Sequence, residues 1–159
     1  MYEPVNIHGI FLDPITERPI LLLKHTADNR ILPIWIGAAE ANAIALQLEH
    51  VKVPRPMTHD LMCGILDQLA SPIEKVLICD LQDNTYFAQI QIKRDQAELL
   101  VDARPSDAVA LAIRVGAPIF VRDDIFDRAG QTEEKEESAE QLSKWLENLN
   151  PEDLGHYEM

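Results

Sequence analysis

The sequence has little cysteine and no long apolar run. Its two cysteines, Cys63 and Cys79, lie far apart and form no Cys-x-x-Cys motif, which argues against a disulfide framework and a zinc site. Reduced thiols are typical of the cytoplasm. The N-terminus lacks a basic segment followed by an apolar one, and no apolar run is long enough to span a membrane. We therefore expect a soluble, cytoplasmic protein.

Positive charge is also scarce. The 159 residues include 14 Lys or Arg and 27 Asp or Glu, a net charge of −13. Broad, sequence-independent nucleic-acid binding needs a basic surface, and the same excess of acid disfavours an anionic membrane. Seven of the thirteen negative charges fall within residues 131–159, however, so the remainder of the chain is only mildly acidic. A small site for a phosphate remains compatible with this balance.

Common catalytic motifs are absent as well. The chain has no glycine-rich phosphate loop, no Gly-x-Ser-x-Gly elbow and no His-Glu-x-x-His pair. Basic residues do not alternate with aromatic ones, as they do in proteins that bind single strands. The sequence therefore excludes several familiar enzyme classes, and any site must come from residues brought together by the fold.

Hydrophobic periodicity predicts an α+β fold with a mixed β-sheet in residues 1–130. Strand–turn–helix units recur along this part of the chain. The predicted strands are 5–12, 20–25, 30–37, 76–81, 86–93, 98–102 and 118–122. The predicted helices are 38–49, 58–69 and 106–115, with Thr58 as an N-cap, Gly116 as a C-terminal stop, and Leu61, Ile65, Leu66 and Leu69 facing inward.

Residues 131–159 form a separate unit in this interpretation, an acidic linker followed by a C-terminal amphipathic helix. Ser138 with Gln141 fits a helix N-cap and its reciprocal partner, and Pro151 ends the helix. The apolar stripe of this helix comprises Leu142, Trp145, Leu146 and Leu149. A short helix of this kind needs a surface to pack on, either on its own domain or on another subunit.

Polar residues that could carry chemistry gather at three junctions between elements: residues 37–42, 55–60 and 102–107. Each junction precedes or opens a predicted helix. Exposed N–H groups at helix N-termini favour anions, and loops at such positions often carry function. These junctions are therefore the candidate sites.

The third junction is the most informative. Asp102 and Asp107 flank Arg104, and two nearby carboxylates can bind Mg²⁺ or Mn²⁺ while an arginine grips a phosphate. A structural explanation is also open. Ser106 would cap the helix, Asp107 would complement the helix dipole, and Arg104 would pair with Asp102.

The other two junctions offer His59, Asp60 and Glu40. His59 could act as a general base or a metal ligand. Neighbouring residues of a helix do not face each other, so His59 and Asp60 need not act together. The alternative is that Asp60 and Glu40 are ordinary first-turn acids and that His59 lies on the surface.

Three segments together resemble the bifunctional nuclease (DNase/RNase) domain family: Leu32–Gly37 with Glu40-Ala41, Arg55–Leu61, and Val101–Ala112. The resemblance spans about residues 5–125 in the order of the family. It implies an α+β fold, self-association, and hydrolysis of DNA and RNA phosphodiesters. The residues that match the family's motif positions are Glu40, His59, Asp60, Asp102, Arg104, Ser106 and Asp107.

Two main hypotheses follow. In the first, the chain is a nuclease: Asp102, Asp107 and Glu40 hold Mg²⁺ or Mn²⁺, His59 transfers a proton, and Arg104 clamps the phosphate of a nucleic-acid substrate. In the second, it is a non-catalytic binding or regulatory module that forms a homo-oligomer, and the junctions are caps and ion pairs. A third idea is a small-anion or nucleotide pocket at the helix N-termini.

Overall fold

The computed structural model describes residues 1–130. The predicted acidic linker and C-terminal helix of residues 131–159 lie outside the described residues, so the domain division at residue 130 stays a prediction. The elements are β1 (Tyr2–Leu12), β2 (Pro19–His25), β3 (Ile31–Trp35), α1 (Ala38–Leu48), α2 (Thr58–Gln68), β4 (Ile73–Gln82), β5 (Thr85–Arg94), β6 (Ala97–Ala103), α3 (Pro105–Val115), β7 (Ile119–Arg122) and α4 (Asp123–Gly130). None of these helices is long and apolar enough to cross a membrane.

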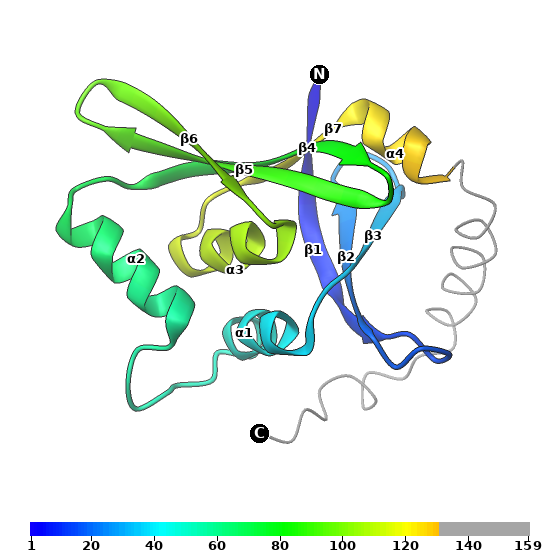
Figure 1. Cartoon of the computed structure of the whole chain (residues 1–159), viewed down its shortest axis with the longest axis horizontal. Coiled ribbons are helices and arrows are strands. Elements are labelled where there is room, and N and C mark those ends of the chain that lie inside the picture. The colour runs from blue at the N-terminus through cyan, green and yellow to red at the C-terminus, as the bar shows by residue number, and fades with distance from the viewer. Residues whose placement is uncertain (131–159) are drawn as a thin grey trace.

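The strands form one seven-stranded mixed sheet in the order β3-β2-β1-β7-β4-β5-β6. Neighbours pair antiparallel except β4 and β7, which are parallel and join the two halves of the sheet. Figure 1 shows α1, α2 and α3 gathered together beside the sheet, while α4 lies apart from them next to β7. The α+β prediction is confirmed.

The core is centred on β2 and α3. The four residues Ile20–Leu23 are almost completely buried, on both faces of β2. Leu21 and Leu23 belong to the main core, whereas Ile20 and Leu22 pack with Phe11 in a smaller cluster. On α3, the buried alanines are small enough to let this helix pack closely against α1 and the sheet. This packing fixes the position of the N-terminus of α3, which belongs to the third predicted junction.

Several local predictions are confirmed and others are wrong. Gly116 ends α3 in the left-handed conformation, at φ 71°. Thr58 and Ser106 are not N-caps, because the chain enters each helix earlier: Met57 is the N-cap of α2, and Arg104, followed by Pro105 at the first helical position, is that of α3.

The predicted inward face of α2 is also wrong. Leu61, Ile65 and Leu69 are 56%, 50% and 54% exposed, although Leu66 packs against the core as expected. The helix instead turns His59 and Cys63 inward together with Leu66. The apolar residues that outline an amphipathic stripe thus face away from the rest of the described chain.

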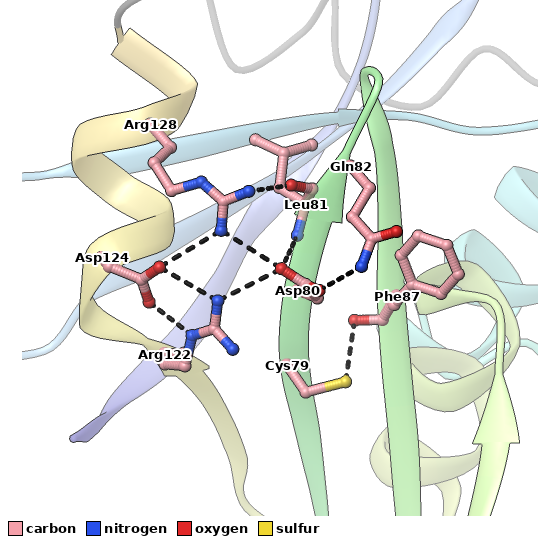
Figure 2. Close-up of polar contacts among 8 residues, drawn as sticks. All are labelled: Cys79, Asp80, Leu81, Gln82, Phe87, Arg122, Asp124 and Arg128. Carbon is pink, nitrogen blue, oxygen red and sulfur yellow. Dashed lines mark hydrogen bonds and ion pairs between the residues drawn. The ribbon is translucent and has the colours of Figure 1, made fainter.

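The helix α4 was not predicted from the sequence, in which the strand 118–122 is the last element expected within residues 1–130. Ion pairs tie it to the sheet (Figure 2). Arg122 at the end of β7 contacts Asp124 of α4 and Asp80 of β4, and Arg128 contacts the same two carboxylates. The guanidinium of Arg128 also donates to the carbonyl of Leu81. This network lies next to the β4–β5 turn rather than at the three junctions.

Candidate active site

A cavity of about 460 Å³ lies where α1, α2 and α3 meet. Its wall includes Glu40 of α1, His59 of α2, and Arg104 and Asp107 at the start of α3. These residues come from all three of the predicted junctions. Each lies at or within three residues of the first residue of its helix, so the packing of three helices brings together groups that are distant in the sequence.

His59 and Asp107 form a direct contact across this cavity. The Nε2 atom of His59 lies 3.0 Å from Oδ1 of Asp107. His59 is 8% exposed, so its ring is held in a mostly buried position. Burial would raise the pKa of Asp107, but hydrogen bonds from Arg104 and His59 outweigh it and hold the pKa of this carboxyl below its usual value. An ionised Asp107 therefore accepts a hydrogen from Nε2 and orients the imidazole.

Arg104 bridges two carboxylates. Its Nε lies 2.9 Å from Oδ2 of Asp107, and its Nη2 lies 2.9 Å from Oε1 of Glu40. The hydrogen bond to Asp107 and then that to Glu40 raise the pKa of Arg104, which keeps the guanidinium charged. The Arg104 side chain is nevertheless 64% exposed. It is thus both fixed by its partners and accessible to an anion.

Gly37 allows Glu40 to reach Arg104. A Cβ atom at position 37 would lie 2.1 Å from Oε2 of Glu40. The Glu40 carboxylate therefore folds back over the first turn of α1 beside Gly37, and a side chain at position 37 would make this carboxylate shift.

Asp60 and Arg114 hold the three helices in this arrangement. Arg114 donates from Nε to Oδ1 of Asp60 at 2.8 Å, and from its other nitrogens to the carbonyls of Ala110 and Ala43. The Asp60 carboxylate also accepts the N–H of Met57 and so stabilises the start of α2. The first-turn interpretation of Asp60 is supported by this contact. Sequence reasoning missed Arg114, although a charged residue on a helix as apolar as α3 is an indication of a specific partner.

Asp102 does not join this group. It lies on β6 opposite Gln89 of β5 and is exposed. Its neighbour Ala103 packs against the main core, and successive residues of a strand point to opposite faces of the sheet. The side chain of Asp102 therefore points away from the helices, and it does not line the cavity. Arg104 pairs with Asp107 and Glu40 rather than with Asp102.

The residues as arranged do not fit a divalent cation. The guanidinium of Arg104 occupies the position between Glu40 and Asp107 where a cation would bridge them, and the second oxygen of Asp107 is used by His59. Within residues 1–130, no group of three or more His, Cys, Asp or Glu side chains is placed to hold a metal ion. We therefore derive no catalytic step from Mg²⁺ or Mn²⁺.

Comparison with known proteins places this sequence in a family. The family model described as the bifunctional nuclease domain matches residues 21–134, a stretch that holds every residue of the cavity. The chain belongs to the bifunctional nuclease domain family. It is also 38% identical over 161 residues to an uncharacterized protein of Mycobacterium tuberculosis, covering 94% of this chain and 96% of that protein.

Plant members of the bifunctional nuclease domain family are more distant. The chain is 25% identical over 120 residues to bifunctional nuclease 1 of Arabidopsis thaliana, and 21% identical over 112 residues to bifunctional nuclease 1 of Oryza sativa subsp. indica. These alignments cover 73% and 69% of this chain, but 37% and 34% of the plant proteins. The chain thus spans about a third of the plant proteins that carry the nuclease name.

Proposed function

We propose that this chain hydrolyses phosphodiester bonds of DNA or RNA at the cavity formed by Glu40, His59, Arg104 and Asp107. The observation that carries the proposal is the His59–Asp107 contact of 3.0 Å beside an exposed guanidinium. An oriented imidazole can transfer a proton in phosphodiester hydrolysis, and a fixed cation can stabilise the charge that develops on the phosphate oxygens. The names of the plant relatives support the same reaction class.

Each of these groups has a role in the proposed reaction. Because Asp107 accepts the hydrogen on Nε2 of His59, the lone pair of the imidazole lies on Nδ1. That atom takes a proton from water as its oxygen attacks phosphorus. The bond from phosphorus to the leaving oxygen then breaks. The leaving oxygen takes a proton from solvent water, and the imidazolium returns its own proton to solvent. Asp107 stabilises the imidazolium while it carries that proton.

Arg104 binds the phosphate. Its Nε and Nη2 are used by Asp107 and Glu40, while Nη1 has no partner among the described residues. Charge-assisted hydrogen bonds from a guanidinium to phosphate oxygens strengthen as negative charge develops on them in the transition state. A single arginine in an acidic chain binds nucleic acid weakly and in a salt-sensitive way. We therefore expect the chain to contact a short stretch of a nucleic-acid strand rather than to follow its length.

Cleavage of labelled single-stranded and double-stranded DNA and RNA by the purified chain tests the proposal. His59→Ala should lower the rate at least about 100-fold, the usual contribution of a general base. The matched control is His8→Ala, because His8 is exposed on β1 and lies outside the cavity. If the wild-type chain cleaves no substrate faster than His59→Ala, the proposal is wrong.

Exposed apolar residues favour a second candidate function, a module that self-associates. Leu61, Ile65 and Leu69 project from α2, and Leu99, Leu100 and Val101 are exposed along β6. The strand β6 is an edge of the sheet, so its free backbone groups can pair with the same strand of another copy. Because such pairing is self-complementary, we propose that a second copy of this chain covers this surface.

A further inference from the structure

A second and larger cavity, of about 950 Å³, lies next to the active-site cavity. It is bounded by the end of β3, the β4–β5 turn, and the N-termini of α1 and α3. Arg104 lines both cavities, whereas His59 and Asp107 line the active-site cavity and Arg18 and Ser106 line this one. The two cavities are therefore adjacent but distinct, and the proposed cleavage reaction uses no side chain that lines the second cavity alone.

The buried hydroxyl of Ser106 is the feature of this cavity that indicates a ligand. It is 5% exposed, and its hydroxyl makes no hydrogen bond to any residue that the structure describes. A buried hydroxyl without a partner destabilises a protein, and most buried polar groups are therefore hydrogen-bonded. Ser106 lines the cavity, so a group bound there can supply the missing partner.

The same wall offers further donors. Gly37 and Arg104 are the N-caps of α1 and α3, and neither helix has a side-chain cap. The first-turn N–H groups of these two helices, which pack against each other, therefore have no side-chain cap, although Glu40 and Asp107 lie in the same first turns. Phosphate is the anion that such N-termini most often bind in proteins.

The charges around the cavity agree with an anionic ligand. Arg18 and Arg104 contribute positive charge to the wall. Asp13 also lines it, but its carboxylate is already engaged by the N–H of Ile15 at 2.9 Å and by Nε1 of Trp35 at 3.2 Å. Arg18, two helix N-termini and a buried hydroxyl thus line the cavity. The carboxylate of Asp13 is occupied by other donors, and those of Glu40 and Asp107, which lie beside the wall, are paired with Arg104.

We propose that this cavity binds a mononucleotide through its phosphate. The phosphate accepts hydrogen bonds from Ser106 and the first turn of α3 and pairs with Arg18. The base lies toward Trp35 and Tyr86, which line the other side of the cavity and offer aromatic surface. The inference does not depend on the cleavage reaction, because a phosphate monoester has no phosphodiester bond to hydrolyse.

Calorimetric titration of the full chain with inorganic phosphate and with adenosine monophosphate tests the proposal. Ser106→Ala should weaken binding of both about tenfold, since it removes a hydrogen bond to a charged group. The matched control is Ser71→Ala: Ser71 is equally buried, but it donates to the carbonyl of Leu69 and lies outside the cavity. Equal binding by the wild type and Ser106→Ala, or no saturable binding by the wild type, would overturn the proposal.

Amide chemical shifts in the wild-type chain give a readout that does not depend on how the variants fold. Adenosine monophosphate should move the N–H signals of Gly37, Thr85 and Ser106, which line this cavity and not the active-site cavity. Shifts confined to Met57 and His59 would place the ligand in the active-site cavity and would contradict the proposal. A chain that binds the mononucleotide but cleaves no nucleic acid would refute the proposed nuclease function and leave this inference standing.

Discussion

Nε2 of His59 lies 3.0 Å from Oδ1 of Asp107, although 48 positions separate the two residues in the chain. His59 is in the first turn of α2, and Asp107 is in the first turn of α3. The contact therefore depends on how these two helices pack. A third residue, Arg104, fixes the other carboxylate oxygen of Asp107. Asp107 thus links the proton-transferring group to the phosphate-binding group.

Asp107→Asn and Asp102→Asn form a matched pair that separates the site from its surroundings. The first substitution removes the negative charge that orients His59, so the cleavage rate should fall at least about 100-fold. The second changes an exposed side chain outside the cavity, and the rate should stay at the wild-type value. Steady-state cleavage of one labelled oligonucleotide by both variants measures the difference. A comparable loss of cleavage rate in Asp102→Asn would show that Asp102 belongs to the active site.

Arg114→Met should destabilise the fold by about 3 kcal/mol, because it leaves Asp60 and two helix carbonyls without their buried partner. Urea denaturation followed by circular dichroism measures the change. Arg94→Met is the control, since Arg94 is exposed at the end of β5. If the two variants unfold at the same urea concentration, Arg114 does not hold the three helices together.

Helices and strands with a strong apolar periodicity were predicted well from the sequence. The direction in which their apolar faces point was predicted poorly. The helix before Gly116 was recognised from its apolar spacing and its terminal glycine. The short α4 was not, because it buries just Ile125, Phe126 and Ala129 and has charged residues in its first and last turns. The position of α2 was misjudged because an apolar stripe indicates that a surface is covered, but not whether the core or another subunit covers it.

The prediction of the candidate site was limited in the same way, because the sequence does not show which way each side chain points. Glu40, His59, Arg104 and Asp107 were proposed from the sequence, and the structure brings all four together. Asp102 was grouped with them because it is close in sequence. It belongs to a strand, where the side-chain direction alternates with each residue, so nearness along the chain did not place it on the side of the helices. Arg114 carries no motif and was found from its contacts alone.

Asp80 should make the stability of the fold sensitive to acid. Hydrogen bonds from Gln82, the N–H of Leu81 and Arg128 lower the pKa of Asp80 from 3.8 to about 2. Because the pKa of Asp80 is lower in the folded state than in the unfolded state, its charge stabilises the fold at pH values above the unfolded-state pKa. This stabilisation is lost as the pH falls from 3.8 through about 2. Asp80→Asn should therefore lower the melting temperature near neutral pH, and the deficit should vanish near pH 2.

Melting curves of the wild type and Asp80→Asn across this pH range measure the effect. Asp83→Asn is the control, because Asp83 is exposed in the β4–β5 turn and forms no ion pair with the residues described. A deficit of Asp80→Asn that stays constant from neutral pH to about pH 2 would show that the charge of Asp80 is not what ties α4 to the sheet.

Mn²⁺ and Mg²⁺ test the metal prediction. Arg104 already pairs with both Glu40 and Asp107 and occupies the position between them, so we expect the wild-type chain to bind neither ion at these carboxylates, and chelation should leave cleavage unchanged. Titration with Mn²⁺, followed by the electron paramagnetic resonance of the free ion, measures binding. Saturable binding that is lost in Asp107→Asn would mean that Arg104 moves aside and that the metal prediction from the sequence is right.

Self-association should depend on the exposed face of α2. Ile65 is 50% exposed at the middle of this face, and a carboxylate placed there would be buried without a partner between two copies. Ile65→Glu should therefore weaken the dimer about tenfold or more, as measured by sedimentation of the full chain over a range of concentrations. Asn6→Asp is the control, because it adds the same charge at an exposed polar position on β1 rather than on α2. A wild-type chain that sediments as a monomer at every concentration, or equal weakening by both substitutions, would rule out this face as the interface between copies.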